Sequence, residues 1–440
     1  SVCVPALCRV CNCWTDSGVT HGALSRMIRQ HWRPRRGDGD QTGSPPLGRR
    51  SLPKRNVMKK IDAISGFPEW LPQGRMVEQL VLETIREKFE LFGFVPIETR
   101  SVEPLDQLTK KGATDKEIYV LRRLHAEQSD GDTGLGLHFD MTVPFARYVM
   151  QHRSELSFPL KRYQIQKAWR GERPQEGRYR EFYQADIDVV AQDTLPLIFD
   201  AEMPWLLHEV MGSLPIPPVT IQINNRKVME GFYRGVGVEN VAGVLRVVDK
   251  LDKIGREGVA RALVDEQGLA SAQADQCLSL AGIQSEDVGF VEAVKSLGVT
   301  SDLMDQGLEE LSFVMRFLSP LPSGAVVADL RIARGLDYYT GTVYEGFMQG
   351  HESLGSVCSG GRYDNLAELY TKQQLPGIGA SLGLDRLLAA LEELEMVEKV
   401  GTPAKVMVAF FDKQRLHDYL GIANLIRQAG VNVELYPEPK

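Results

Sequence analysis

The sequence of 440 residues has few cysteines and no long apolar run. Four of its six cysteines crowd at positions 3, 8, 11 and 13, which does not form the framework of a disulfide-stapled secreted protein. We therefore expect a reducing, cytoplasmic compartment. No apolar stretch reaches the roughly 20 residues that a membrane-spanning helix needs, so a membrane protein is excluded. The composition, 43% hydrophobic and 25% charged, is typical of a globular protein, and the length is enough for two or three domains.

Positive charge is scarce after residue 57. Residues 1–57 hold ten Lys or Arg against three Asp, so the rest of the chain holds 41 basic and 55 acidic residues, a net charge of −14. An acidic body argues against DNA as a partner. It still allows a nucleic acid that contacts only a local basic patch.

Residues 1–57 are rich in Arg, Gly and Pro and poor in aliphatic residues, which predicts a disordered basic leader. Two origins stay open: an organelle-targeting leader, or a start assigned too early, with Met58 as the true first residue. The cysteines at 8, 11 and 13 have no second cysteine pair nearby to complete a zinc site. We therefore expect no metal bound by the protein.

The first folding signal is a helical pattern from Met76 to Phe92, which Gly93 ends before the short strand FVPIET. Such a helix can pack on a core or on a twin subunit. Its apolar positions, expected on one face, are Val77, Leu80, Val81, Ile85 and Phe89.

The remaining pattern predicts an α+β protein with an antiparallel sheet flanked by helices. Residues 240–322 are helical in pattern and interrupt two strand-rich blocks, as an inserted subdomain would. The tail from Lys405 begins a strand–helix–strand α/β unit that stops early, so we expect a shortened domain there. The expected organisation is a leader (1–57), a first part of the main domain (58–239), a helical insertion (240–322), a second part of the main domain (323–400) and the start of a further domain (405–440).

The run KRYQIQKAWRGERPQEGRYREFYQADIDVV predicts a hairpin whose two strands each carry a polar face. Arginine binds phosphate and carboxylate through two parallel hydrogen bonds, and five arginines fall between positions 162 and 180. We therefore predict a polar binding floor, against the alternative of a hairpin whose polar face lies in solvent. The floor residues are Arg162, Gln164, Gln166 and Arg170 on the first strand, and Phe182, Gln184, Asp186 and Asp188 on the second.

The run PGIGASLGLDRLLAALEEL places Arg386 in the first turn of a helix, where backbone N–H groups already favour an anion. Its glycines miss the GxGxxG spacing, so a dinucleotide-binding fold is disfavoured. GASLG matches the GxSxG pattern, which would make Ser381 a hydrolase nucleophile. That interpretation needs a later Asp and His, and only His417 follows. The anion-binding helix is the better interpretation.

The stretch RGLDYYTGTVYEGF gathers Arg334, Asp337, Tyr338 and Tyr339 after an apolar run, which suggests a ligand with a negative charge and a small polar ring. With it, the chain resembles class II aminoacyl-tRNA synthetases: the hairpin resembles their motif 2, the SLGLDR helix their motif 3, and the first helix and strand their motif 1. From about residue 60 onward the chain resembles the histidyl-tRNA synthetase family in particular. The segments that carry this resemblance are HFDMTVP, GERPQEGRYREFYQ, INNRK, RGLDYYTGTVYE and SGGRYDNL.

The resemblance implies a pocket for histidine beside one for ATP, with Arg170 and Arg334 as catalytic residues. It implies that ATP meets Arg170 with its α-phosphate, Phe182 and Glu172 with its adenine, and Arg178 and Arg386 with its outer phosphates. The histidine-binding residues that it implies are Asp140, Thr142, Arg170, Gln184, Asp188, Arg334, Tyr338 and Tyr339, with Tyr363 lining the same pocket.

The resemblance further implies histidine activation by ATP with Mg²⁺, transfer to tRNA(His), and a homodimer. It also implies that the C-terminal α/β unit, expected to be truncated, is the start of an anticodon-binding domain. A non-catalytic, synthetase-like regulatory subunit of histidine biosynthesis is the alternative, and sensor kinases carry a similar module, because this fold alone does not prove catalysis.

Overall fold

The computed structural model describes residues 62–109, 117–124, 134–175, 177–333, 339–364, 374–396 and 400–436. These ranges belong to one compact unit that begins at Asp62. The predicted leader, with its cysteine motif, lies outside the described residues, and so do Arg334, Asp337 and Tyr338. The domain boundaries expected at residues 239, 322 and 400 stay a prediction.

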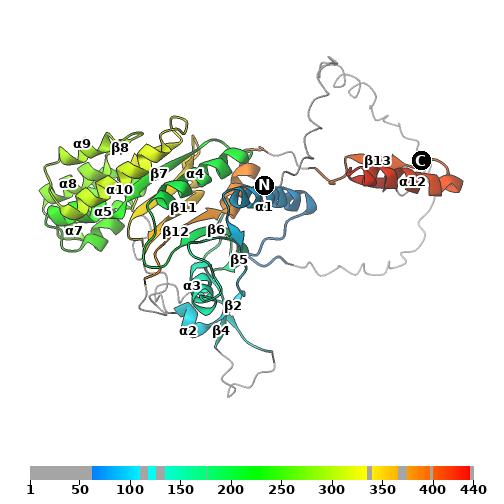
Figure 1. Ribbon diagram of the computed structural model, residues 1–440, viewed down its shortest axis with the longest axis horizontal. Helices are drawn as coiled ribbons and strands as arrows, with labels where there is room; N and C mark the ends of the chain where they lie inside the picture. Colours follow the sequence, from blue (N-terminus) through cyan, green and yellow to red (C-terminus); the bar gives the residue numbers. More distant parts are fainter. Residues whose placement is uncertain are drawn as a thin grey trace, which may run out of the picture. The chain divides into compact units, whose positions relative to one another are not determined.

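A nine-stranded sheet is the centre of the fold, in the order β1-β5-β6-β12-β11-β10-β7-β9-β8 (Figure 1). Its pairs are antiparallel except β1 with β5 and β7 with β9. This is the predicted α+β architecture, an antiparallel-dominated sheet flanked by helices. The strands are β1 (Val95–Pro96), β5 (Leu160–Trp169), β6 (Glu181–Val190), β7 (Val219–Asn225), β8 (Gln284–Ser285), β9 (Val326–Asp329), β10 (Thr342–Met348), β11 (Cys358–Tyr363) and β12 (Gly377–Gly383).

Side-chain alternation divides this sheet into an apolar and a polar face. In β6, Ala185, Ile187 and Val189 are buried in the main core, as are Ile378, Ala380 and Leu382 in β12. Helices α1 (Pro72–Leu91), α4 (Ile198–Ser213) and α11 (Leu384–Glu393) contribute to that same core. The intervening polar residues of β6 and β12 therefore point to the other face.

Helix α1 ends where the sequence predicted, because Gly93 adopts a positive φ of 79° that other residues rarely take. The apolar face of the helix was predicted with one error. Val81, Ile85 and Phe89 are buried, but Leu80 is 49% exposed and Leu82 takes its place in the core. The 3.6-residue period of a helix predicts that these residues form one stripe. It fixes the direction in which the stripe points only to within about one residue.

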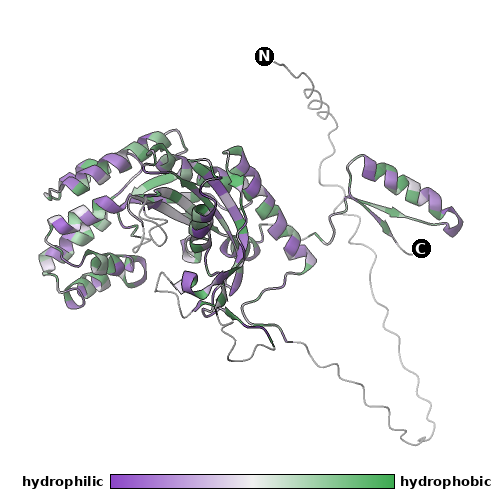
Figure 2. Cartoon of the chain, turned by 60° about the horizontal axis from the view of Figure 1, so that its bottom comes forward, coloured by the Kyte–Doolittle hydropathy of each residue, from purple (hydrophilic) through white to green (hydrophobic). Residues whose placement is uncertain are grey.

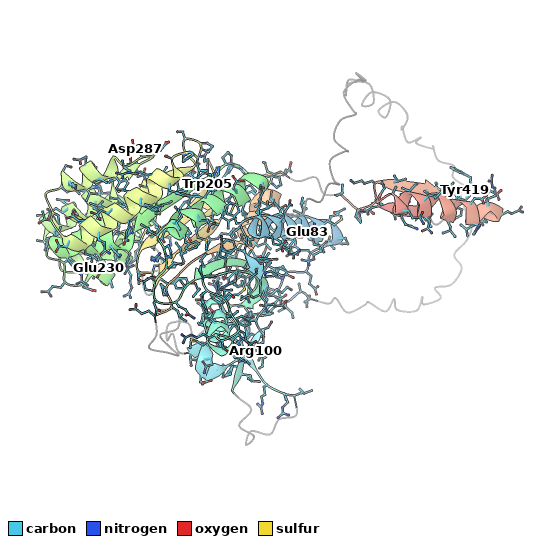
Figure 3. All side chains as sticks on the ribbon, viewed as in Figure 1. Glu83, Arg100, Trp205, Glu230, Asp287 and Tyr419 are labelled. Carbon is cyan, nitrogen blue, oxygen red and sulfur yellow. The ribbon has the colours of Figure 1, made fainter. Side chains whose placement is uncertain are left out.

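The predicted helical segment forms five helices beside β7 and β9. In Figure 1 they group at one end of the sheet, together with α5 (Arg226–Gly235). Trp205 of α4, labelled in Figure 3, meets Phe317 edge-on at 5.9 Å and so links this group to the sheet helices. The five helices are α6 (Val241–Val248), α7 (Leu251–Asp265), α8 (Ser271–Ala281), α9 (Phe290–Lys295) and α10 (Asp302–Leu318).

Smaller elements complete the described fold. Figure 2 shows polar and apolar residues on each helix, as expected for helices with one face on a core. No described helix has the length and the apolar content that a bilayer span requires. The elements are a sheet of β2 (Val102–Pro104), β4 (Leu135–Leu137) and β3 (Val120–Leu121), helices α2 (Leu105–Leu108) and α3 (Thr142–Gln151), and the 3₁₀ turn η3 (Glu352–Leu354).

The tail forms the predicted strand–helix–strand unit. Strands β13 (Val406–Ala409) and β14 (Val433–Tyr436) are parallel, and α12 (Leu416–Gln428), preceded by the turn η4 (Lys413–Arg415), connects them. A helical crossover is the usual connection between two parallel neighbours.

Candidate active site

A cavity of about 460 Å³ opens on the polar face of the sheet, over β6, β12, β11 and β10. The hairpin loop between β5 and β6 and the first turn of α11 complete its walls. Every described residue that the family resemblance assigns to the histidine or ATP site lines this cavity. These residues are Asp140, Thr142, Arg170, Glu172, Arg178, Phe182, Gln184, Asp188, Tyr339, Tyr363 and Arg386.

Asp188 lies in a buried network at one end of the cavity. Its Oδ2 pairs with Nη2 of Arg162 at 2.5 Å, and its Oδ1 accepts a hydrogen bond of 2.6 Å from the Tyr363 hydroxyl. Burial raises the pKa of Asp188, while the Arg162 charge and the Tyr363 hydrogen bond lower it. Both oxygens of the Asp188 carboxylate therefore have a partner within the protein, which fixes this side chain in the cavity wall.

The glycines of β12 and β11 make room for these side chains. A Cβ at Gly379 would overlap the Asp188 carboxylate, and one at Gly377 would overlap the Tyr363 ring. A Cβ at Gly361 would press on the Tyr339 ring. The glycines therefore shape this end of the cavity, whereas the sequence suggested only that Gly377 and Gly379 precede a helix.

Asp186 is the neighbour of Asp188 on the same face of β6. Burial raises its pKa to about 7, against the opposing effect of Arg162. The Gln184 amide donates from Nε2 to both Asp186 oxygens, at 3.3 and 3.4 Å, and to Ser381 Oγ at 3.2 Å. Ser381 itself hydrogen-bonds the Asp186 carboxylate.

Arg170 begins the hairpin loop and is held from two sides. Its Nε donates to the carbonyl oxygen of Phe139 at 2.9 Å, and its guanidinium lies 4.9 Å from the centre of the Phe182 ring. A cation over an aromatic face is an attractive arrangement. Because Nε already donates to the Phe139 carbonyl oxygen, a ligand would meet the two terminal nitrogens of the guanidinium.

The far end of the cavity carries Arg178 and Arg386, the other two predicted arginines among the residues that the structure describes. Arg178 pairs through Nη2 with Oε2 of Glu172 at 2.5 Å, and Arg386 donates to the carbonyl of Ser356. Asp385 precedes Arg386, and its carboxylate accepts the backbone N–H of Tyr179 from the hairpin loop. Burial raises the pKa of Asp385 to about 7. The loop and the start of α11 are therefore joined through Asp385.

Three of the eight residues of the predicted polar floor were placed wrongly. Arg162, Gln164 and Gln166 on β5 are buried and do not line the cavity. The two glutamine amides bond to Thr99 and Gln166 also to Ser101, because residues 99–101 cover this part of the sheet. Alternation predicts which residues share a face, but it does not predict what covers that face.

The count of arginines also overstated the number available for phosphate. Arg162 is buried in its ion pair, and Arg180 donates to the carbonyls of Glu172 and Ser65. Of the five arginines between 162 and 180, only Arg170 and Arg178 line the cavity. The others are structural or exposed.

Several lining residues had no assigned role in the sequence. Asp186, Ser381, Ser359 and Glu345 lie opposite one another on four neighbouring strands and form a polar row across the cavity floor. Asp186 was recognised only as a member of the polar face, and Ser381 only as a hydrolase candidate. Ser359 and Glu345 stood in the quoted segments SGGRYDNL and RGLDYYTGTVYE without an assigned role, since the register that joins them connects distant segments.

Among the described residues that line the cavity, Ser381 has no histidine that could serve as the catalytic base of a hydrolase. The Ser381 hydroxyl interacts with Gln184 and Asp186. The described residues also contain no group of three His, Cys, Asp or Glu side chains arranged to hold a metal ion.

This architecture is that of the class II aminoacyl-tRNA synthetases, in which an antiparallel sheet carries one cavity and the β5–β6 hairpin and α11 each contribute an arginine to it. The family model described as histidyl-tRNA synthetase matches residues 66–387, and the chain belongs to that family.

The chain is similar in sequence to histidine–tRNA ligases over most of its length. The histidine–tRNA ligase of Thermobifida fusca is 53% identical over 375 residues, which cover 85% of this chain and 86% of that protein. The histidine–tRNA ligase of Cutibacterium acnes is 50% identical over 389 residues, 87% and 86% of the two chains.

The fold is also similar to the folds of solved structures. The histidyl-tRNA synthetase of Nostoc sp. PCC 7120 superposes with a TM-score of 0.79 at 36% identity and covers 87% of each chain. A Bacillus halodurans protein titled as an ATP phosphoribosyltransferase regulatory subunit/histidyl-tRNA synthetase gives a TM-score of 0.70 at 21% identity, over 85% of this chain and 92% of that one. The second likeness concerns the fold alone.

Proposed function

We propose that this protein activates L-histidine with ATP and transfers the histidyl group to tRNA(His). The observation that carries the proposal is that residues from five separate segments, expected for histidine and for ATP, line one cavity. The relatives named as histidine–tRNA ligases, which match over most of the chain, support the same activity.

The end of the cavity around Asp188 is the proposed histidine pocket. Asp140, Thr142 and Gln184 receive the α-ammonium group, since carboxylate, hydroxyl and amide oxygens accept its hydrogens. Asp188 and Tyr339 hold the two ring nitrogens, and Tyr363 lines the pocket. Tyr338 and Arg334 are assigned to this pocket from the family resemblance.

The end around Arg170 is the proposed ATP site. The histidine carboxylate attacks the α-phosphate in line, which forms histidyl-adenylate and releases pyrophosphate. Arg170 and Arg334 neutralise the charge that develops on that phosphate, so no general base is required. Adenine stacks on Phe182 and meets Glu172, while Arg178 and Arg386 bind the outer phosphates.

ATP enters as its magnesium complex. Mg²⁺ usually keeps several waters and binds through substrate phosphates and one or two carboxylates. Glu345 is a buried carboxylate of the cavity floor that fits the role of such a ligand.

The assembly and place of action belong to the same proposal. Helix α1 exposes Leu80 and Leu91, with exposed fractions of 49% and 70%, and a twin subunit would cover them. We therefore propose a homodimer that charges tRNA(His) in the cytoplasm.

Histidine-dependent exchange of pyrophosphate into ATP tests the first half-reaction, and charging of tRNA(His) tests the second. We expect both with histidine. Replacing histidine by leucine should reduce exchange by about 10⁴-fold or more, because buried groups made for ring nitrogens are left unpaired. Histidine binding without exchange would instead favour the non-catalytic regulatory subunit. Comparable exchange with leucine would contradict the assignment.

A further inference from the structure

The amide of Gln184 has a defined orientation, and Asp186 sets it. With Nε2 toward the carboxylate, the amide donates to both Asp186 oxygens and to Ser381 Oγ. The flipped amide would place its own oxygen 3.3 to 3.4 Å from two carboxylate oxygens, which is repulsive. The ionised carboxylate therefore selects one of two orientations of similar shape.

That selection leaves the Gln184 oxygen as a free acceptor. Oε1 is buried and has no hydrogen-bond partner in the part of the chain that the structure describes. A buried polar atom without a partner is costly, and Gln184 is a residue of the cavity lining, so this oxygen is a candidate acceptor for a ligand donor. Gln184 lines the cavity together with Asp140 and Thr142, which are expected to receive the ammonium group.

We propose that Asp186 is a positioning residue for amino acid recognition, which holds the Gln184 amide so that its oxygen accepts a hydrogen bond from the substrate α-ammonium group. This inference rests on the proposed function, because it needs an amino acid in the cavity. Ser381 assists by bonding both partners from β12.

The charged groups around Asp186 favour a positively charged ligand. Arg162 on β5 attracts its carboxylate, while Asp188 on β6 and Asp140 before α3 repel it. These carboxylates make the cavity wall favourable for a cation. A bound ammonium group in turn favours the ionised form of Asp186, the form that fixes the amide.

The test compares two ligands that differ only in the amino group. Binding of L-histidine and of imidazolepropionic acid, which lacks the amine, is measured by calorimetry for the wild-type protein and Asp186→Asn. The asparagine keeps the shape but has both a donor and an acceptor, so it no longer selects one amide orientation. We expect histidine to bind about tenfold more weakly, as for the loss of one charged hydrogen bond, and imidazolepropionic acid to bind within about twofold of wild type.

A double-mutant cycle separates positioning from charge. Gln184→Met keeps the volume and removes the acceptor, so it should also weaken histidine binding. If Asp186 acts through Gln184, the double variant binds histidine no more weakly than Gln184→Met alone. If the two losses multiply, Asp186 acts by its own charge and the inference is overturned.

Asp200→Asn is the control for neutralising a buried carboxylate. Asp200 is fully buried and pairs with Arg362 away from the cavity, so its loss should lower the melting temperature without changing the ratio of the two affinities. An equal loss for both ligands in Asp186→Asn would overturn the inference. A wild-type protein that does not bind histidine would overturn the proposed function and this inference with it, whereas normal histidine binding by Asp186→Asn overturns the inference alone.

Discussion

Arg170 is held in a fixed position, and its positive charge lies at the wall of the cavity. The hydrogen bond from its Nε to Phe139 and its contact with the Phe182 ring hold the guanidinium at the cavity wall before any substrate arrives. Pre-organised charge is more effective than charge that must be moved into place, because no reorganisation accompanies the reaction. The same reasoning explains why a lysine, which lacks the planar fork, is a poor substitute.

Arg170→Ala should therefore slow adenylate formation by roughly 10²- to 10³-fold, the range for losing one pre-organised donor. Arg170→Lys should lose less. Single-turnover formation of histidyl-adenylate measures this step. Arg173→Ala is the matched control, since Arg173 is exposed in the same loop and does not line the cavity. Equal rates for Arg170→Ala and Arg173→Ala would refute the role.

At the scale of elements, β12 shows how the glycines of a strand shape a site. Gly379 lies opposite Asp188 in the sheet, and the carboxylate occupies the space that a Cβ would need. Asp188 cannot easily move, because Arg162 and Tyr363 hold both of its oxygens. A single methyl group at Gly379 would thus overlap the carboxylate that is proposed to bind the histidine ring.

We expect Gly379→Ala to weaken histidine binding by about tenfold or more and to lower the melting temperature, as overpacking does. Gly212→Ala is the matched control in helix α4, where an added Cβ meets nothing within 4 Å. It should stabilise the protein by up to about 1 kcal/mol, the usual gain of Ala over Gly in a helix. Calorimetry and thermal unfolding give both quantities. Normal histidine affinity in Gly379→Ala would contradict the packing argument.

The junction between α11 and the hairpin loop predicts a pH dependence of stability. Burial raises the pKa of Asp385 from 3.8 to about 7, so between these values the folded protein binds a proton that the unfolded chain has lost. Stability from this group therefore falls as the pH rises through that window. Asp385→Asn still accepts the Tyr179 N–H and cannot ionise.

The melting temperature of Asp385→Asn, relative to wild type, should thus be higher at pH 8 than at pH 5. Thermal unfolding at the two pH values measures the difference. A variant that keeps the same offset from wild type at both values would show that Asp385 titrates normally.

At the scale of the whole molecule, the exposed side of α1 bears on assembly. Leu80 is half exposed although it lies in the segment that the sequence assigned to an apolar face. In a homodimer such a residue is buried by the partner, and obligate dimer interfaces are more apolar than ordinary surface.

Leu80→Glu should shift the protein from twice the chain mass of 49.1 kDa toward the monomer, because a charge would enter the interface. Sedimentation equilibrium reports the mass. Phe313→Glu, at a comparably exposed position on α10, should leave it unchanged. A wild-type protein that sediments as a monomer would contradict the proposed dimer.

The sequence by itself determined the periodic features. Alternation in β6 predicted that Phe182, Gln184, Asp186 and Asp188 share a face, and the glycine after α1 predicted where that helix ends. Both follow from local backbone geometry, which each segment carries without the rest of the chain. The motifs that resemble the histidyl-tRNA synthetase family added the residues that meet in one cavity.

Only the tertiary structure decided which partners those residues have. Segment 99–101 covers the polar face of β5, so Arg162 became the buried counter-ion of Asp188 and not a phosphate ligand. The row from Asp186 through Ser381 and Ser359 to Glu345 exists because four distant strands pair in one register. Register is set by the burial of a whole sheet face, and a local pattern contains no information about the strand that will lie beside it.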